Sequence, residues 1–468
     1  MSSHKLSLLE KIGYGSGDMA VNVVISSMML IITFFYTDVF GLDPVDVGYL
    51  LLSVRLIDAI TDPLMGIITD KYTTRWGRYR PYFLIMAIPF GISVFLTFST
   101  PDLDYNSKLV WAYATYIFVT IMFTMVTIPY ISIIGVMTDN PKEKLSANGY
   151  RLFFAKIAAL LVTMVVPVLA ESWGGEDLAS GYQFAMGLMA ILGALLFIFC
   201  FFTTKERIEH KVETKPFISQ IKLLVKNDQW LILCAICVVG TIGYVIRGSV
   251  ALYYAKYYLG ADATMSSAFL STGVAAAIIA MVASTWITKH YCKIKLFRYS
   301  QLFVGLLSVM MYFFVAPGDI MLAFILYFSL SFIVDLHAPV FWSIISEAID
   351  YGTVKTGERV SGLAYGGISF SQKAGMGLAG FIVGMLLTYF NYQADQEQSA
   401  STLTGIALML SIIPGVFHAI MGLLMFKYKI NNEKYEEIKQ KLAVSANSIN
   451  EQNTPEINAK GSTPSATV

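Results

Sequence analysis

The sequence predicts an all-α membrane protein with twelve transmembrane helices arranged as two six-helix halves. Three observations lead to this fold class: an apolar composition, a series of apolar runs of membrane-spanning length, and a short internal repeat. Of the 468 residues, 56% are hydrophobic and only 14% are charged, and the mean hydropathy is +0.62. A soluble protein of this size carries about a quarter charged residues, so we expect a chain that crosses a lipid bilayer repeatedly.

The apolar runs give the number of membrane crossings. A helix needs about 20 residues to span a hydrocarbon core of about 30 Å. Several runs contain proline, which membrane helices tolerate where neighbouring groups satisfy the freed backbone. The sequence contains twelve such runs, and we expect a transmembrane helix in each of them: 14–36, 46–69, 82–100, 109–136, 152–170, 182–203, 231–256, 265–287, 296–315, 319–346, 361–390 and 403–426.

Basic residues between the spans predict the orientation. The connection after the second span has four lysines and arginines between Lys71 and Arg80, and the connection after the sixth has six between Lys205 and Lys226. The odd-numbered connections carry mainly aspartate and glutamate. Cytoplasmic loops of membrane proteins are enriched in lysine and arginine. We therefore expect a multi-pass membrane protein with both termini in the cytoplasm.

A short repeat predicts the two halves. EKLSANGY (Glu143–Tyr150) and ERVSGLAY (Glu358–Tyr365) each follow an aspartate, Asp139 or Asp350, and lie six spans apart with the same orientation. This is typical of two six-helix halves related by an axis along the membrane normal. We expect four parts: an N-terminal half at 1–203, a cytoplasmic connecting loop at 204–230, a C-terminal half at 231–427 and a cytoplasmic tail at 428–468.

The loop and the tail have distinct patterns. Within the loop, Phe217–Val225 is amphipathic and predicts a surface helix on the membrane. The tail is first charged and then rich in serine, asparagine and threonine. We expect a short helix at 432–443 and disorder over the rest of the tail, because such a composition cannot bury enough apolar surface to fold.

A charged cluster lies inside the second span. Arg55, Asp58 and Asp62 are spaced three and four residues apart and so share one face of a helix. A charge at the centre of a membrane helix costs about 2.5–3.5 kcal/mol on insertion scales, and such residues default to function. A structural ion pair between Arg55 and one carboxylate is the alternative, but it leaves the second aspartate unpaired. The cluster therefore predicts a cation site that faces protein or a water-filled path.

The loop after the second span has an ordered signature. Gly66-x-x-x-Asp70-Lys71-x-x-x-Arg75-x-Gly77-Arg78-x-Arg80-Pro81 resembles the cytoplasmic loop signature of the major facilitator superfamily, which implies the major facilitator fold. Anchoring of the basic residues to the membrane surface is the alternative interpretation. We expect these residues, with two at the end of the tenth span, to gate the transport path: Asp70, Arg75, Arg78, Asp350 and Arg359.

Further motifs narrow the resemblance. Together they are similar to the glycoside–pentoside–hexuronide:cation symporters, the family of the melibiose carrier, and the similarity runs from Gly13 to about Lys427. The resemblance implies sugar transport coupled to sodium or protons, with alternating access around a site at the membrane midplane. The motifs are Gly13-Tyr14-Gly15, Phe35-Tyr36-Thr37-Asp38, Asp58-Ala59-Ile60-Thr61-Asp62-Pro63, Arg75-Trp76-Gly77, Ile128-Pro129-Tyr130 and Asp350-Tyr351-Gly352.

The resemblance implies a cation site made by four residues. Asp58 and Asp62 match the cation-site aspartates of the family, and Thr124 matches a supporting threonine. Hard oxygen ligands suit sodium, whereas a desolvated carboxylate pair can share a proton. Thr61 stands where sodium-using relatives often have asparagine, so the coupling ion is expected to be a proton at least as readily as sodium. We expect no cofactor and no other metal.

The resemblance also implies a substrate site that departs from the melibiose-type members. Those members place an aspartate in span one and another in span four, where this chain has Asn22 and Thr127. Arg151 and Lys373 match positive positions of the family's sugar and cation sites. Lys156 adds a cation about one and a half turns beyond Arg151.

Loss of carboxylates beside retained cations predicts an anionic substrate, because guanidinium groups bind carboxylate or sulfonate in bidentate fashion. We expect a uronate, a sulfosugar or a small organosulfonate such as dihydroxypropanesulfonate, and nearness to the organosulfonate-transporting members of the family. The alternative is a neutral pentoside or glycoside held by Asn22, Thr127 and aromatic residues. In this fold Trp342 lies on the substrate-facing wall.

Two further charges have open interpretations. Asp18, near the start of the first span, is expected to cap a helix or face water. Arg247, in the seventh span, either contacts substrate or makes a structural pairing with Asp335 or with backbone carbonyls.

The whole sequence thus predicts a secondary active transporter, working in import or export, and not an enzyme. Its expected partners are a small polar substrate, a coupling cation and the lipid bilayer, with no nucleic acid, and the protein is expected to be a monomer.

Overall fold

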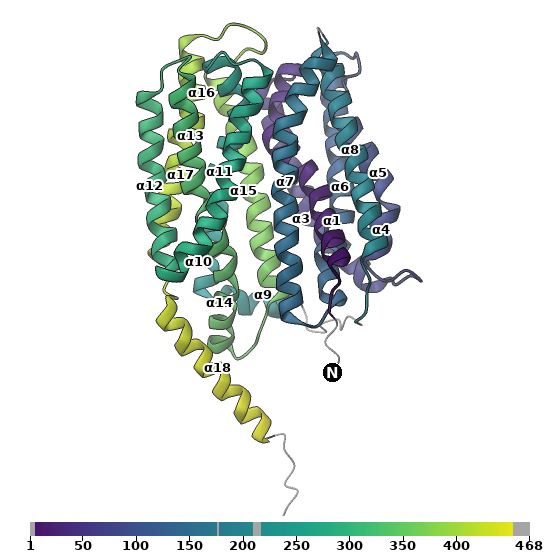
Figure 1. Cartoon of the computed structure of the whole chain (residues 1–468), viewed down its shortest axis with the longest axis vertical. Helices are drawn as coiled ribbons and strands as arrows, with labels where there is room; N and C mark the ends of the chain where they lie inside the picture. The colour runs from purple at the N-terminus through teal and green to yellow at the C-terminus, as the bar shows by residue number, and fades with distance from the viewer. Residues whose placement is uncertain (1–4, 176, 209–216, 453–468) are drawn as a thin grey trace, which may run out of the picture.

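The protein is a bundle of long, nearly parallel helices. The structure is a computed structural model that describes residues 5–175, 177–208 and 217–452, and no β-strand occurs in these ranges. One group of helices lies beside a second group (Figure 1). The first group consists of α1 (Leu8–Leu30), α2 (Ile32–Phe34), the π-helical turn η1 (Phe35–Val39), α3 (Pro44–Lys71), α4 (Arg80–Ile85), α5 (Ala87–Thr97), α6 (Tyr105–Met137), α7 (Pro141–Gly174) and α8 (Leu178–Thr203).

The short helix α9 (Phe217–Val225) lies at the predicted surface segment and precedes the second group. That group ends in α18, which extends away from the bundle (Figure 1). Its elements are α10 (Asp228–Tyr253), the π-helical turn η2 (Tyr254–Tyr258), α11 (Ala263–His290), α12 (Lys293–Phe314), α13 (Ile320–Asp335), α14 (Ala338–Thr356), α15 (Gly362–Tyr389), α16 (Ala400–Leu410), α17 (Ile412–Leu424) and α18 (Asn432–Gln452).

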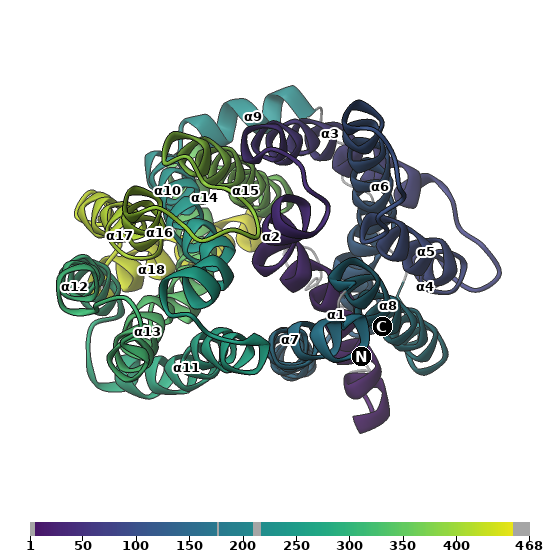
Figure 2. The same cartoon turned by 90° about the horizontal axis from the view of Figure 1, so that it is seen from above.

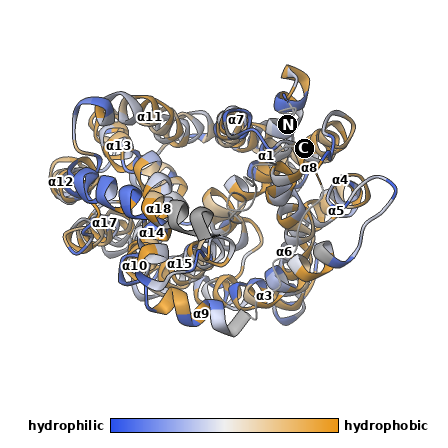
Figure 3. Ribbon diagram, turned by 90° about the horizontal axis from the view of Figure 1, so that it is seen from below, coloured by the Kyte–Doolittle hydropathy of each residue, from blue (hydrophilic) through white to orange (hydrophobic). Residues whose placement is uncertain are grey.

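The predicted fold class is confirmed, since helices occupy all twelve predicted ranges. Nine helices of the described chain are long and apolar enough to cross a membrane, or ten if α1 and the segment Ile32–Val39, bent by 53°, count as one. The remaining two ranges differ for local reasons. Helix α3 carries the charges of the Arg55 cluster, and the third range is broken into α4 and α5 at Met86. Hydrophobic residues predominate in the helices of the bundle, whereas α18 carries many hydrophilic residues (Figure 3).

Some boundaries differ from those predicted. Helix α1 begins at Leu8 rather than 14, because Ser7 and Glu10 form a reciprocal capping box. The tenth range is divided into α13 and α14, and the helix continues to Thr356. The predicted disorder directly after residue 443 is wrong, since α18 extends to Gln452. The rest of the tail lies outside the described residues.

In each group a π-helical turn follows the first long helix, directly after α10 and after the short helix α2 in the case of α1. In η1 the Phe40 amide donates to the Phe35 carbonyl at 2.8 Å, and in η2 the Leu259 amide donates to Tyr254 at 3.0 Å. A glycine in the left-handed region follows each turn, at φ 76° for Gly41 and 66° for Gly260. The two halves therefore share this feature as well as their helix order. The limits of the halves at 203 and 230 stay a prediction.

The two groups meet along α3 with α15 and along α7 with α11 (Figure 2). Glycines allow the close approach of α3 and α15 near the end where α3 begins. A Cβ atom on Gly384 would lie 2.3 Å from the Pro44 carbonyl oxygen and 2.9 Å from the Gly48 Cα. Charged side chains on these two helices are thereby brought within contact distance farther along the pair.

Candidate functional site

A charged cluster joins α3 to α15. Lys373 Nζ on α15 lies 3.2 Å from Asp58 Oδ1 and 2.6 Å from Asp62 Oδ2, both on α3. Asp58 is only 1% exposed. The aspartates predicted as a cation site thus lie together, and Lys373, predicted as a substrate residue, lies between them.

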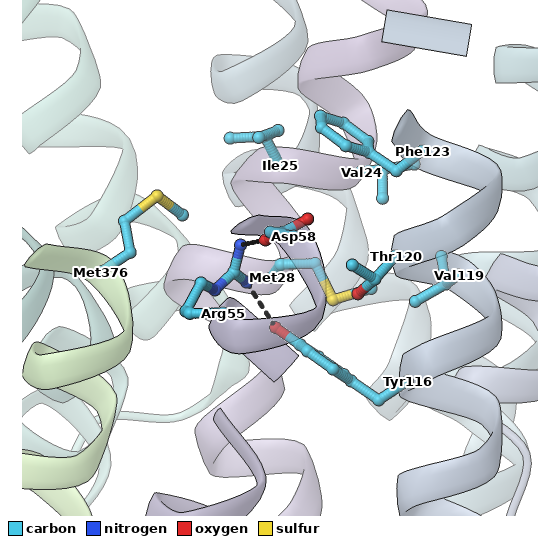
Figure 4. A pocket seen from close by; sticks show the side chains of 10 residues that line it. All are labelled: Val24, Ile25, Met28, Arg55, Asp58, Tyr116, Val119, Thr120, Phe123 and Met376. Carbon is cyan, nitrogen blue, oxygen red and sulfur yellow. Dashed lines mark hydrogen bonds and ion pairs between the residues drawn. The ribbon is translucent and has the colours of Figure 1, made fainter. Parts of the chain in front are cut away.

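Three other side chains complete the cluster. Arg55 Nη1 is 2.7 Å from Asp58 Oδ2, and its Nη2 donates to the Tyr116 hydroxyl at 3.2 Å (Figure 4). Thr124 Oγ1 donates to Asp62 Oδ1 at 2.9 Å, so the predicted supporting threonine reaches the site. The ion pair of Arg55 considered as an alternative does form. It does not leave Asp62 unpaired, because Lys373 binds that carboxylate.

Thr61 is not brought into the cluster. Its hydroxyl donates to the Ile57 carbonyl of the same helix at 3.1 Å. Within the described ranges, no group of three or more histidine, cysteine, aspartate or glutamate residues could hold a metal ion. The oxygen atoms of two aspartates and one threonine instead suit a single monovalent cation or a proton.

Apolar residues surround the Arg55 side of the cluster. About 370 Å³ of empty space lies beside Arg55, Asp58 and Tyr116. Figure 4 shows Tyr116 reaching from α6 toward Arg55 and Asp58 of α3, with apolar side chains from α1, α6 and α15 around them. Such surroundings strengthen the attraction between the charges. The apolar lining residues are Val24, Ile25, Met28, Val119, Phe123 and Met376.

The structure places Asp18 beside two predicted substrate residues. Arg151 Nε lies 3.5 Å from Asp18 Oδ1, and the Asn22 amide nitrogen lies 3.3 Å from Asp18 Oδ2. Asp18 is 7% exposed, so the expectation that it caps a helix or faces water is wrong. Asp18 lies one helical turn before Asn22. Its carboxylate therefore supplies a negative charge close to the position where the melibiose-type members have an aspartate and this chain has Asn22.

Thr127 and Trp342 have no contact that joins them to Arg151 in the described structure. The Thr127 hydroxyl is buried and finds no hydrogen-bond partner among the described residues. Trp342 is 48% exposed and meets Phe341 edge to face at 5.9 Å. These two residues stay predictions as substrate contacts.

A second cavity lies between the two groups of helices. It holds about 730 Å³ of empty space including its open mouth, and its walls come from α1, α7, α10, α11 and α13. The charged lining residues are Lys156, Arg247 and Asp335. Lys156 Nζ lies 4.0 Å from Asp335 Oδ1, so Lys156 makes the ion pair considered for Arg247. The Arg247 Nε instead donates to a backbone carbonyl, that of Leu410, at 3.3 Å, which is the other structural pairing considered for it.

The predicted gating residues divide into two places. Arg359 Nη1 lies 2.5 Å from Asp350 Oδ1, and Tyr435 of α18 donates to Asp350 Oδ2 at 2.9 Å. In the other loop, the Arg75 guanidinium lies 4.7 Å above the Trp76 ring. The backbone amide of Arg78 donates to Glu206 at 2.9 Å, which connects this loop to its own half. The side chain of Asp70 lies outside the described residues.

A hydrogen-bonded cluster lies at the end of the molecule opposite α18. Asp38 of η1 accepts hydrogen bonds from Tyr257 of η2 and, at 2.5 Å, from Tyr392 after α15. Lys256 Nζ lies 3.5 Å away, and the Asp38 side chain is fully buried. We call Asp38, Lys256, Tyr257 and Tyr392 the Asp38 cluster. From sequence, Asp38 was only the last residue of a family motif and Lys256 had no predicted role, although both lie beside the aromatic ends of two spans.

Comparison with known proteins finds a transporter family and relatives named as symporters. The family model "MFS/sugar transport protein" matches residues 13–432. The inner membrane symporter YicJ of Escherichia coli is 32% identical, covering 95% of this chain and 96% of YicJ. The putative glycoside/cation symporter YagG of the same organism is 35% identical, covering 94% of this chain and 95% of YagG.

More distant similarities bear on substrate and fold. The putative sulfoquinovose importer of Escherichia coli is 28% identical, covering 94% of this chain and 97% of that protein. The crystal structure of a D-xylose–proton symporter has a TM-score of 0.62 at 15% identity, covering 90% of this chain and 97% of that one. The expected resemblance to cation symporters, including sulfonate-transporting members, is confirmed.

Proposed function

This chain belongs to the MFS/sugar transport protein family, and from this premise we propose that it transports an anionic sugar or sugar-derived compound together with a cation. It is a membrane transporter and not an enzyme. The proposal includes both termini in the cytoplasm of a bacterial inner membrane, a monomeric carrier, and operation in import or export.

The position of Lys373 carries the proposal of cation coupling. Its ammonium bridges Asp58 and Asp62, and the bridge joins α15 to α3 and thus one half to the other. A sodium ion or a proton that binds these carboxylates competes with the ammonium for the same oxygen atoms. Cation binding therefore releases an ion pair between the halves, and a ligand that binds one conformation better shifts the equilibrium toward it.

The charge balance supports an anionic substrate. Arg151 faces Asp18, and Arg55 and Lys373 face Asp58 and Asp62, so these two groups are each neutral overall. The cavity between the halves has two cations, Lys156 and Arg247, but only one charged carboxylate in its lining. A uronate, a sulfosugar or a small organosulfonate supplies the missing negative charge.

Two observations favour a second candidate, a neutral pentoside or glycoside. Asp18 accepts a hydrogen bond from Asn22, so a carboxylate remains available there to bind sugar hydroxyls. YagG, whose name describes a putative glycoside/cation symporter, also has a higher identity to this chain than the putative sulfoquinovose importer.

Uptake into proteoliposomes tests both candidates. D-glucuronate, sulfoquinovose and methyl β-D-xyloside are offered under a sodium gradient or a pH gradient, each imposed separately. Cation-driven accumulation of the acids alone supports the proposal. Accumulation of only the xyloside supports the second candidate, and uptake that responds to neither gradient contradicts cation coupling.

A further inference from the structure

Arg247 is a buried cation with an unmet hydrogen-bonding need. It lies on α10, is 5% exposed, and its Nε donates to the Leu410 carbonyl at 3.3 Å. Its Nη2 atom is buried and has no hydrogen-bond partner among the described residues. A buried N–H donor without an acceptor costs free energy that an added acceptor recovers. The guanidinium also lines the cavity between the halves.

The surroundings of Arg247 suit an anion. Lys156 on α7 lines the same cavity, and the one lining carboxylate, Asp335 on α13, lies 4.0 Å from Lys156. Two cations thus share one carboxylate. The lining also includes the hydroxyl-bearing residues Ser26, Tyr244, Tyr327 and Ser331.

A glycine makes room for one of these hydroxyl groups. A Cβ atom on Gly273 of α11 would lie 2.9 Å from the Tyr327 ring and from its hydroxyl oxygen. The absence of a side chain at this position therefore lets the phenol of Tyr327 take its place in the cavity wall.

We propose that Arg247 binds the acid group of the transported compound, a monoanionic sugar acid with a carboxylate or a sulfonate. The planar guanidinium offers two parallel N–H donors to such a group. Lys156 adds the second positive charge, and the tyrosine and serine hydroxyls face the hydroxyl groups of the sugar. This inference rests on the proposed anionic substrate and names the residue that selects it.

Binding to the purified full-length protein in detergent tests the inference. Isothermal titration with D-glucuronate, sulfoquinovose and D-glucose is performed on the wild type, Arg247→Gln and Arg247→Lys. We expect Arg247→Gln to weaken binding of both acids by about 30-fold or more, which is about 2 kcal/mol at 1.4 kcal/mol per tenfold. Glucose binding should change little, and Arg247→Lys should retain part of the affinity for the acids.

A matched control is Arg298→Gln. Arg298 on α12 also donates to a main-chain carbonyl, that of Met425 at 3.2 Å, but it does not line the cavity. It should leave acid binding unchanged. A second variant, Asp335→Asn, tests the cavity without altering Arg247, since loss of the competing carboxylate should tighten acid binding.

The outcomes separate the two proposals. If the wild type binds the acids, and folded Arg247→Gln binds them equally well, the role of Arg247 is refuted while the anionic substrate stands. Should Arg247→Gln fail to fold, an unchanged or weaker acid affinity of Asp335→Asn would overturn the inference instead. If the wild type binds glucose but neither acid, the proposed substrate class fails and the inference fails with it.

Discussion

Replacing Lys373 by glutamine tests whether this lysine competes with the coupling cation. In the proposed mechanism, a cation must displace an ammonium that lies 2.6 Å from Asp62 and 3.2 Å from Asp58. The variant keeps a side chain of similar length but removes the charge. The cation should then bind the carboxylates more tightly, although the two halves lose an ion pair that joins them.

The expected gain follows from the burial of this ion pair. Exposed ion pairs are worth about 0–1 kcal/mol, whereas breaking a buried pair costs about 3–5 kcal/mol. The side chains of Lys373 and Asp62 are 21% and 25% exposed, so the pair is intermediate. An ion-pair free energy of about 1–3 kcal/mol, released when the lysine charge is removed, corresponds to a gain of about 5- to 150-fold in cation affinity at 1.4 kcal/mol per tenfold.

The assay follows the melting temperature of the purified protein as a function of sodium concentration and, separately, of pH. A ligand that binds the folded state raises its melting temperature by mass action. The matched control is Lys355→Gln, because Lys355 lies 2.6 Å from Asp228 in an exposed pair. Equal or weaker cation binding by folded Lys373→Gln would refute competition, and an equal gain in the control would show a general charge effect.

Three other changes should have distinct effects. Asp62→Asn should abolish cation-driven accumulation while leaving counterflow of substrate, and loss of both would contradict a dedicated cation role. Gly384→Leu should lower stability by about 1–3 kcal/mol through overpacking, measured by thermal unfolding, because its Cβ would lie 2.3 Å from the Pro44 oxygen. Burial and a hydrogen bond to Asp350 raise the pKa of Tyr435 to about 12. The phenol therefore stays protonated at neutral pH, and its bond weakens only as the pH rises through that value. Tyr435→Phe should increase proteolysis of α18 at neutral pH, and unchanged cleavage would argue against this contact as a docking point.

The sequence predicts the spans well because hydrophobicity and length are local properties of a segment. The shared face of Asp58 and Asp62 is also local, as it depends only on their spacing along one helix. The partner of these aspartates is not local. Lys373 lies 311 residues away from Asp62, and no periodic pattern specifies which helix of one half will face α3.

The same reason explains the residues whose roles were misjudged. Asp18 was expected to cap a helix or face water because it lies near the start of a span. The packing of α1 against α7 instead brings Arg151 to it. Asp38 was named only as part of a family motif, although the π-helical turn and the other half enclose it. Both cases depend on how helices pack, which hydropathy does not encode.

Because Lys373 is part of α15, its positive charge affects how much net charge the carrier moves across the membrane. The charge that pairs with Asp58 and Asp62 in the unloaded carrier always stays with the protein. A monovalent cation that replaces it adds one unit of charge to the moving complex, and a monoanionic substrate removes one. Such a cycle crosses the bilayer without net charge, so the membrane potential, worth about 2.3 kcal/mol per charge at 100 mV, neither drives nor opposes it. Only the concentration gradients then set how far the substrate accumulates.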